Sequence, residues 1–273
     1  MPDIDSHGIS LSYTDSGGDG RPVVLIHGWP LSGASWSEQV PALTGAGYRV
    51  VTYDRRGFGD SDKPETGYDY DTFAADLAGV LDGLDLSDVT LVGFSMGGGE
   101  VARYLGKHGD ARIHSAVFAG AVPPYLLKTE DNPDGGLEEK DVQGMLQGAA
   151  TDREAFLDGF TTDFFSAGGE LKVTEEQRQQ ALALAGKAGD AGLVGCITAF
   201  GTTDFRADLA TITVPTLVIH GDSDAIVPVE VSGKRTADSV SGAELVIVED
   251  GPHGFNVSHS EEFNRHLLAF LEK

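Results

Sequence analysis

The chain has 273 residues, of which 40% are apolar, and carries a formal net charge of −24. A surface this acidic repels phosphate backbones and anionic lipids, so we expect neither a nucleic-acid nor a membrane partner. No apolar run approaches the roughly 18 residues that a membrane span requires. Residues 1–20 are polar and acidic, unlike a secretory signal, so we expect a cytoplasmic protein.

The single cysteine, Cys196, cannot form an internal disulfide, which fits a reducing compartment. Its apolar neighbours indicate packing rather than chemistry. The acidic composition fits an ordinary acidic protein, and it also fits one from a salt-adapted host, where concentrated salt would screen the self-repulsion.

The first half of the chain alternates predicted strands with predicted helices. The predicted strands are short apolar runs at residues 23–26, 48–53, 89–92 and 113–118. Apolar residues recur at helical spacing from residue 71 to residue 84, and residues 99–107 also read as a helix. Strands separated by helices indicate βαβ units, and therefore an α/β fold with a mainly parallel sheet.

This alternation stops at residue 123. Polar, glycine-punctuated segments with helical periodicity replace the apolar runs until residue 209, after which strands at 216–220 and 244–248 and a closing helix at 261–272 complete the pattern. Helices inserted between two strands of one sheet form a lid rather than a separate domain. We therefore expect an α/β core, residues 1–122 and 210–273, with a helical cap at residues 123–209.

A short motif in the middle of the core predicts a nucleophile. Gly93-Phe94-Ser95-Met96-Gly97 matches the pattern G-x-S-x-G, follows an apolar strand and precedes a helix, which is the setting of a nucleophile elbow. The glycines are needed because such a turn is too tight for flanking Cβ atoms. We expect Ser95 to be exposed above the carboxyl edge of the sheet; the alternative is a glycine-rich turn with an incidental serine.

A serine hydroxyl needs a base within hydrogen-bonding reach, and two later loops supply the partners. Asp224 lies in the loop after the strand at 216–220, and His253 lies in the loop after the strand at 244–248. Such loops at the carboxyl ends of strands are where open α/β sheets bind ligands. The chain order Ser, Asp, His is that of the α/β hydrolases, so we expect His253 to be the base and Asp224 to orient it.

Each of these two assignments has an alternative. Asp222 lies in the same loop as Asp224, but it is closer to the strand and is more suited to binding loop backbone donors. His259 is the alternative to His253, which is favoured because it lies in a glycine-flanked loop directly after a strand.

The tetrahedral intermediate of acyl transfer needs two donors for its oxyanion. We expect the backbone N–H of Met96, the residue after the nucleophile, to be the first. The second is expected from the loop after the first predicted strand, namely the N–H of Trp29, since Pro30 has none.

Three segments, Gly93–Tyr104, Asp54–Ser61 and Val122–Thr129, resemble the bacterial non-haem chloroperoxidases, which are also described as cofactor-free haloperoxidases, arylesterases and perhydrolases. The resemblance covers nearly the whole chain and departs mainly between residues 140 and 192. It implies an α/β-hydrolase fold, with a mostly parallel eight-stranded sheet flanked by helices and a helical cap inserted after the sixth strand. It also implies the triad Ser95, Asp224 and His253, with oxyanion donors Trp29 and Met96.

The resemblance implies an esterase that works through an acyl-enzyme on small aryl or short-chain acyl esters. Water would release a carboxylic acid from it, and hydrogen peroxide would release a peracid that oxidises halide in solution. In relatives, a proline after the oxyanion residue is associated with stronger perhydrolysis, and Pro30 stands there. We expect no cofactor and no metal. Relatives are often oligomers, so a homo-oligomer is left open.

Aromatic residues are candidates for the apolar wall of the substrate pocket, although any of them could be plain core. The pocket candidates are Pro30, Phe94, Phe160, Phe164, Phe165 and Phe200, together with Trp29. The elbow serine excludes dehalogenases and epoxide hydrolases, which need a carboxylate there. A lactonase, a carbon–carbon bond hydrolase, a hydroxynitrile lyase and a ligand receptor that kept the triad stay open.

Overall fold

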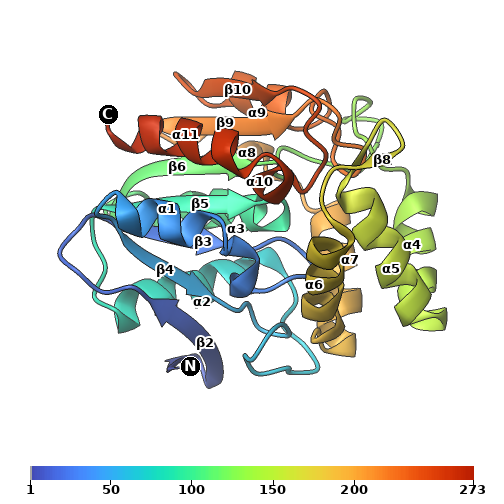
Figure 1. Ribbon diagram of the computed structural model, residues 1–273, viewed down its shortest axis with the longest axis horizontal. Coiled ribbons are helices and arrows are strands. Elements are labelled where there is room, and N and C mark those ends of the chain that lie inside the picture. The colour runs from blue at the N-terminus through green and yellow to red at the C-terminus, as the bar shows by residue number, and fades with distance from the viewer. Residues whose placement is uncertain (1) are drawn as a thin grey trace.

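An eight-stranded sheet, in the order β1-β2-β4-β3-β5-β6-β9-β10, forms the centre of the computed structural model, which describes residues 2–273 (Figure 1). The strands are β1 (Asp3–Ser6), β2 (Ile9–Asp15), β3 (Pro22–Ile26), β4 (Arg49–Tyr53), β5 (Val89–Phe94), β6 (Ile113–Ala119), β9 (Thr216–Gly221) and β10 (Glu244–Val248). β2 is antiparallel to both β1 and β4, and all other pairs are parallel. The expected mostly parallel sheet of an α/β hydrolase is therefore confirmed.

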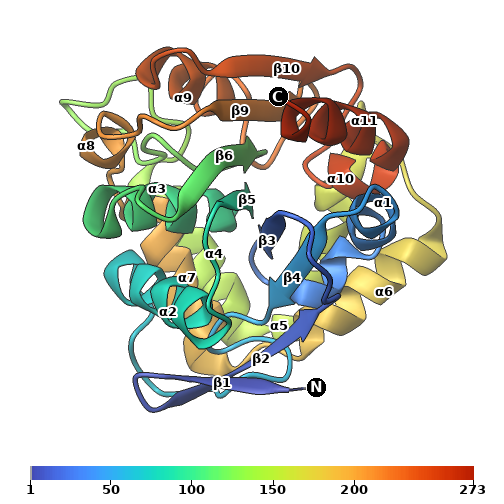
Figure 2. The ribbon, with the colours of Figure 1, turned by 90° about the vertical axis from the view of Figure 1, so that its left-hand side faces the viewer.

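Helices cover both faces of this sheet (Figure 2). The helices of the core are α1 (Gln39–Gly45), α2 (Tyr70–Gly83), α3 (Met96–His108), α9 (Gly233–Ser239), α10 (Phe255–Ser258) and α11 (Ser260–Leu271). α2 and α3 pack together on one face, while α1 and α11 pack together on the other. Because β5 lies between these two layers, all six of its residues are buried, which explains why its sequence is apolar rather than alternating.

Residues 123–209 connect β6 to β9 and carry four longer helices. They are α4 (Glu139–Thr151), α5 (Arg153–Phe164), α6 (Glu175–Gly186) and α7 (Asp190–Thr202), followed by the short α8 (Arg206–Leu209). α4 to α7 lie beyond the carboxyl ends of the parallel strands (Figure 1). These inserted helices therefore cover the carboxyl edge of the sheet.

The structure also contains strands that the sequence pattern did not predict. Neither β1 nor β2 was predicted: β1 alternates exposed and buried residues, β2 mixes apolar with polar residues, and the two pair at the edge of the sheet. In the inserted segment, β7 (Ser166–Ala167) and β8 (Glu170–Leu171) form a minimal hairpin. Gly168 and Gly169 close its turn at φ values of 59° and 84°, which glycine adopts without steric cost.

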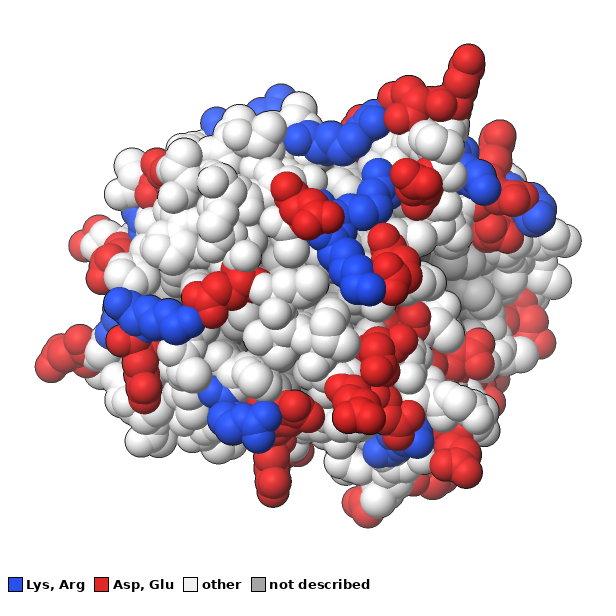
Figure 3. Space-filling model, turned by 90° about the horizontal axis from the view of Figure 1, so that it is seen from above, with Lys and Arg blue, Asp and Glu red and all other residues white. Residues whose placement is uncertain are grey.

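Acidic side chains are spread over the face drawn in Figure 3, and several lie beside basic ones. Among the ion pairs of the molecule, Arg206 contacts Asp131 at 2.7 Å and Asp204 at 2.6 Å. Within residues 2–273, no single helix is long and apolar enough to cross a membrane. Only α6 and α7 taken together have the length and composition of a membrane span, and the chain bends by 102° between them.

Candidate active site

Ser95 lies on a sharp turn between β5 and α3, with a positive φ of 52°. The two glycines of its motif make this turn possible. A Cβ on Gly93 would lie 2.5 Å from the carbonyl oxygen of Gly97, and a Cβ on Gly97 would lie 2.4 Å from the carbonyl oxygen of Ile26. The chain can therefore approach itself closely enough to hold the serine above the sheet edge, as a nucleophile elbow requires.

The structure brings Ser95, His253 and Asp224 together from three separate loops. Nε2 of His253 lies 2.9 Å from Oγ of Ser95, and Nδ1 of His253 lies 2.6 Å from Oδ2 of Asp224. The carboxylate of Asp224 only accepts hydrogen bonds when ionised, so Nδ1 carries the proton and Nε2 is left to accept from the serine hydroxyl. All three residues are buried. The expectation of an exposed Ser95 is therefore wrong: the residue is 7% exposed, because side chains of the segment 123–209 line the space beside it.

The environment of Asp224 stabilises its ionised form. Its Oδ1 accepts hydrogen bonds from the backbone N–H groups of Ile226 and Val227, at 2.9 and 2.8 Å. Its Oδ2 lies 3.3 Å from Nε2 of His220, which also donates to the carbonyl of Val227. Burial opposes ionisation, but the imidazoles of His253 and His220 outweigh it and hold the pKa of Asp224 well below its usual range.

The two alternatives considered from the sequence lie outside this arrangement. Oδ1 of Asp222 accepts from the backbone N–H of Asp250 at 2.8 Å, the loop-stabilising contact that its position suggested. His259 precedes α11 and contacts the hydroxyl of Ser258 at 2.9 Å through Nδ1.

The two candidate oxyanion donors belong to segments next to the serine: Met96 follows it in the chain, and a Cβ on Gly28, the residue before Trp29, would lie 3.0 Å from Cβ of Ser95. Met96 begins α3, so its N–H has no acceptor within the helix. The same end of α3 is the positive end of the helix dipole, which favours a negative charge there. Trp29 follows β3, and its indole Nε1 donates to the carbonyl of Leu193 in α7 at 3.1 Å. Within residues 2–273, neither backbone N–H donates to a carbonyl elsewhere in the chain.

Ser95 opens on a small apolar cavity of about 50 Å³. Its walls are formed by Trp29, Val122, Leu126, Leu137, Met145, Phe160, Phe200, Ile226 and Val227. Of the residues proposed from the sequence, the structure brings Trp29, Phe160 and Phe200 to this cavity. The aliphatic residues were not singled out, because nothing in the sequence distinguishes an aliphatic pocket wall from ordinary core.

The other aromatic candidates lie elsewhere. Phe94, Phe164 and Phe165 line a second cavity of about 340 Å³, between α6 and the segment that precedes α1. Phe164 also packs edge-on against the imidazole of His253, with ring centroids 5.0 Å apart. Pro30 is buried and lines neither cavity.

Two further features bear on the chemistry that the site can support. Within residues 2–273, no three side chains of the metal-ligating types gather into a group that could hold an ion. Cys196 lies on α7 and is completely buried, and burial raises the pKa of its thiol to about 12, which makes it a poor nucleophile.

Comparisons with known proteins agree with this geometry. Residues 21–260 match the model of the alpha/beta hydrolase fold family. The chain is 45% identical, over 97% of both chains, to a non-haem chloroperoxidase of Kitasatospora aureofaciens. It is 37% identical to a bifunctional esterase/perhydrolase of Acinetobacter calcoaceticus, over 97% of this chain and 96% of the relative.

A solved structure also resembles this chain closely. The crystal structure of a bromoperoxidase from Bacillus anthracis superposes with a TM-score of 0.97 at 53% identity, covering 100% of this chain and 99% of that one. The chain therefore belongs to the α/β hydrolase fold family and, within it, to the group of the non-haem chloroperoxidases and their esterase relatives.

Proposed function

We propose that the protein is a serine hydrolase of carboxylic esters that also forms peracids from hydrogen peroxide. The observation that carries this proposal is the contact of 2.9 Å between Nε2 of His253 and Oγ of Ser95, with Asp224 on the far side of the imidazole. The chloroperoxidase and esterase/perhydrolase names of its relatives support the same chemistry.

The first half-reaction acylates the enzyme. Nε2 of His253 takes the proton of the Ser95 hydroxyl while Oγ attacks the ester carbonyl carbon. The carbonyl oxygen becomes an oxyanion held by the N–H groups of Trp29 and Met96. When the tetrahedral intermediate collapses, the C–O bond to the alcohol breaks, and the imidazolium returns the proton to the departing alkoxide. Asp224 stabilises the imidazolium throughout.

The second half-reaction releases the acyl group. Water gives a proton to Nε2 of His253 as its oxygen attacks the acyl carbon. The bond from that carbon to Oγ of Ser95 then breaks, the imidazolium returns the proton to Oγ, and a carboxylic acid leaves. Hydrogen peroxide reacts in the same way and yields a peracid. The peracid then transfers oxygen to halide in solution, which accounts for a chloroperoxidase activity without a cofactor.

The size of the cavity suggests the substrate class. A volume of about 50 Å³ beside Ser95, with apolar walls, suits a short acyl group such as acetyl. Five of its wall residues, Leu126, Leu137, Met145, Phe160 and Phe200, come from the segment 123–209. We propose that this segment acts as a cap that selects small esters. In keeping with the single buried thiol, we also propose a cytoplasmic location.

Turnover of p-nitrophenyl acetate tests the proposal. We expect hydrolysis by the wild type and its abolition by Ser95→Ala. Adding hydrogen peroxide, bromide and monochlorodimedone is expected to bleach the dye faster with the wild type than with Ser95→Ala. A folded wild type without turnover on any ester would indicate a receptor instead, and ester turnover without dye loss would leave a plain esterase.

A further inference from the structure

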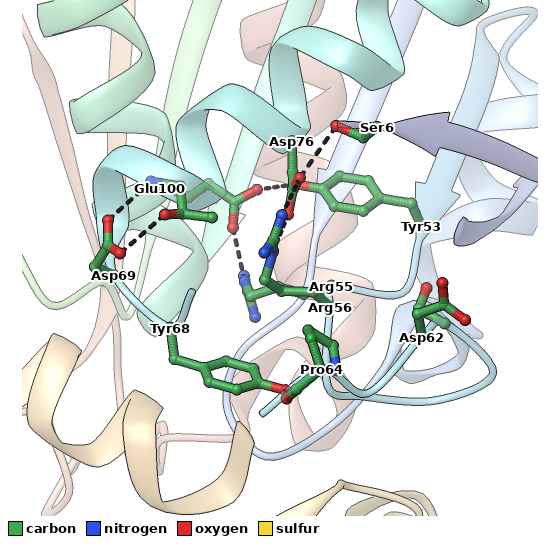
Figure 4. A network of polar contacts seen from close by, with 12 residues as sticks. Ser6, Tyr53, Arg55, Arg56, Asp62, Pro64, Tyr68, Asp69, Asp76 and Glu100 are labelled. Carbon is green, nitrogen blue, oxygen red and sulfur yellow. Dashed lines mark hydrogen bonds and ion pairs between the residues drawn. The ribbon is translucent and has the colours of Figure 1, made fainter. Parts of the chain in front are cut away.

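A chain of buried polar contacts joins the two segments that carry the candidate oxyanion donors. The guanidinium of Arg55 donates from Nε to Oε2 of Glu100 at 2.7 Å and from Nη2 to the backbone carbonyl of His27 at 2.9 Å. Figure 4 shows Arg55 and Glu100 facing one another, with the hydroxyl of Tyr53 directed at the same carboxylate. Arg55, Glu100 and His27 are each 0% exposed, so solvent cannot substitute for these bonds.

The imidazole of His27 extends this chain toward Trp29. Its Nε2 accepts from the backbone N–H of Arg55 at 3.0 Å, and its Nδ1 donates to the carbonyl of Gly28 at 2.9 Å. Burial and the neighbouring charge of Arg55 lower the pKa of His27 well below its usual range, so the ring is neutral and keeps this single tautomer. The imidazole of His27 therefore fixes the peptide group between Gly28 and Trp29 through its carbonyl oxygen.

The other end of the chain reaches the nucleophile helix. Glu100 lies one turn after Met96 on α3, so its position is rigidly coupled to the first N–H of that helix. The two donor amides are thus connected by one continuous path through His27, Arg55 and Glu100.

A buried ion pair is costly, and apolar residues of the same size are often as stable or more so. Arginine keeps its charge in proteins, so Glu100 serves as its counter-charge even though burial raises the pKa of that carboxyl. The ion pair fixes the orientation of the groups that it joins, because each hydrogen bond constrains an angle as well as a distance. Apolar packing does not supply this constraint.

We propose that the Arg55–Glu100 pair is a positioning device for the oxyanion hole, which fixes the loop from His27 to Trp29 against the first turn of α3. The proposal rests on the proposed function. Arg55, Glu100 and Tyr53 are positioning residues that do not touch the substrate. They act by setting the distance between the N–H groups of Trp29 and Met96.

The test uses Glu100→Gln, which keeps the shape of the side chain and removes its charge. Outright loss of one oxyanion donor costs about 10²- to 10³-fold in kcat, so we expect a displaced donor to cost about 10- to 100-fold. KM for p-nitrophenyl acetate is expected to stay within about twofold of wild type, because the donors act mainly on the transition state. Affinity for a trifluoromethyl ketone, which forms an oxyanion on Ser95, is expected to fall by the same factor as kcat.

Asp76→Asn is the matched control. Arg56, next to Arg55, forms a second buried pair with Asp76 on α2, at 2.6 and 2.7 Å. In the part of the chain that the structure describes, no hydrogen bond joins this pair to His27 or to α3. Its loss is therefore expected to lower stability as much as Glu100→Gln does while leaving kcat within about twofold of wild type. Tyr53→Phe is a milder variant, with an expected kcat loss of about 3- to 10-fold, should Glu100→Gln not fold.

The outcomes separate the two proposals. A wild type without ester turnover would overturn the proposed function itself. An active wild type whose folded Glu100→Gln and Tyr53→Phe variants keep wild-type kcat and ketone affinity would overturn the positioning role alone. An equal loss of kcat in Asp76→Asn would also overturn it, because the effect would then follow stability.

Discussion

Nδ1 of His253 lies 2.6 Å from Oδ2 of Asp224, and both side chains are almost completely buried. The second oxygen of the carboxylate is already occupied by two backbone N–H groups of the same loop. Asp224 therefore cannot rotate away from the imidazole without breaking those bonds. The imidazole in turn presents only Nε2 to Ser95, which is the tautomer that a general base needs.

Replacing the carboxylate by an amide tests this relationship. In Asp224→Asn the amide can donate to Nδ1, which moves the ring proton to Nε2 and prevents it from accepting from Ser95. We expect kcat to fall by about 10⁴-fold with the fold retained. Asp222→Asn is the control, measured in the same ester assay. Since Asp222 binds only loop groups, we expect nearly full activity; equal losses in both variants would point to the loop rather than to the base.

The same residue gives a prediction for stability against pH. The folded pKa of Asp224 is held below the ordinary value of 3.8, so its ionised form contributes stability that is fully present above about pH 4. This contribution is lost as pH falls through the folded pKa. Urea unfolding of the wild type and of Asp224→Asn should differ most at neutral pH and converge in acid. A difference that grows below pH 4 would contradict the assignment.

The elbow makes a steric prediction. An alanine at position 97 would place its Cβ against the backbone carbonyl of Ile26, so β3 or α3 must shift. We expect Gly97→Ala to destabilise the fold by about 2 kcal/mol or more and to lower kcat by about 100-fold through misplacement of Ser95. Gly144→Ala in α4 has open space and is expected to gain about 0.5–1 kcal/mol with unchanged kcat. Thermal unfolding and ester kinetics check both.

Phe164 lines the second cavity and contacts a wall residue of the small cavity at Ser95. Its ring contacts Phe160, a wall residue of the first cavity, at 5.8 Å between centroids, while it lines the second. Removing the ring in Phe164→Ala should join the two spaces. We expect kcat/KM for esters with a bulky acyl group, relative to acetate esters of the same alcohol, to rise about 10-fold. The cost in stability is expected to be about 3–5 kcal/mol.

Phe165→Ala is the control for that change, because Phe165 lines the second cavity and packs against Phe164 without reaching Phe160. It should lose stability to a similar degree without changing the preference for ester size. A shift of equal size in both variants would show that general loosening, and not the wall at Phe164, sets the size limit.

The core strands and the elbow could be predicted because their signals are local. Short apolar runs such as residues 23–26 indicate strands buried on both faces, and the structure extends this one by a single residue, to Pro22–Ile26. Gly93 and Gly97 meet a steric demand within one turn. The loops bearing Asp224 and His253 could be placed because the carboxyl ends of parallel strands share one edge. β1 was not predicted, since its four residues alternate in burial and contain only one large apolar side chain.

The pocket was predictable only in part, and the reason is physical. Leu126, Met145 and Ile226 are aliphatic residues whose sequence neighbourhood is the same whether they face a cavity or the core. Phe94 ends β5 and Phe164 ends α5, and both rings lie near the imidazole of His253 but line the second cavity. Which cavity each ring lines depends on how these two elements pack, and the local sequence does not indicate it. The link from Arg55 to Glu100 joins residues 45 positions apart and leaves no periodic signal.

Labelling with a serine-directed phosphonate tests the central claim most directly, because only a hydroxyl activated by a neighbouring base reacts readily with it. After digestion and mass spectrometry, we predict one phosphonyl group, on Ser95, in the wild type. We predict none in Ser95→Ala and markedly slowed labelling in His253→Ala. A label on another residue, or ester turnover by a folded wild type whose Ser95 stays unmodified, would contradict the account.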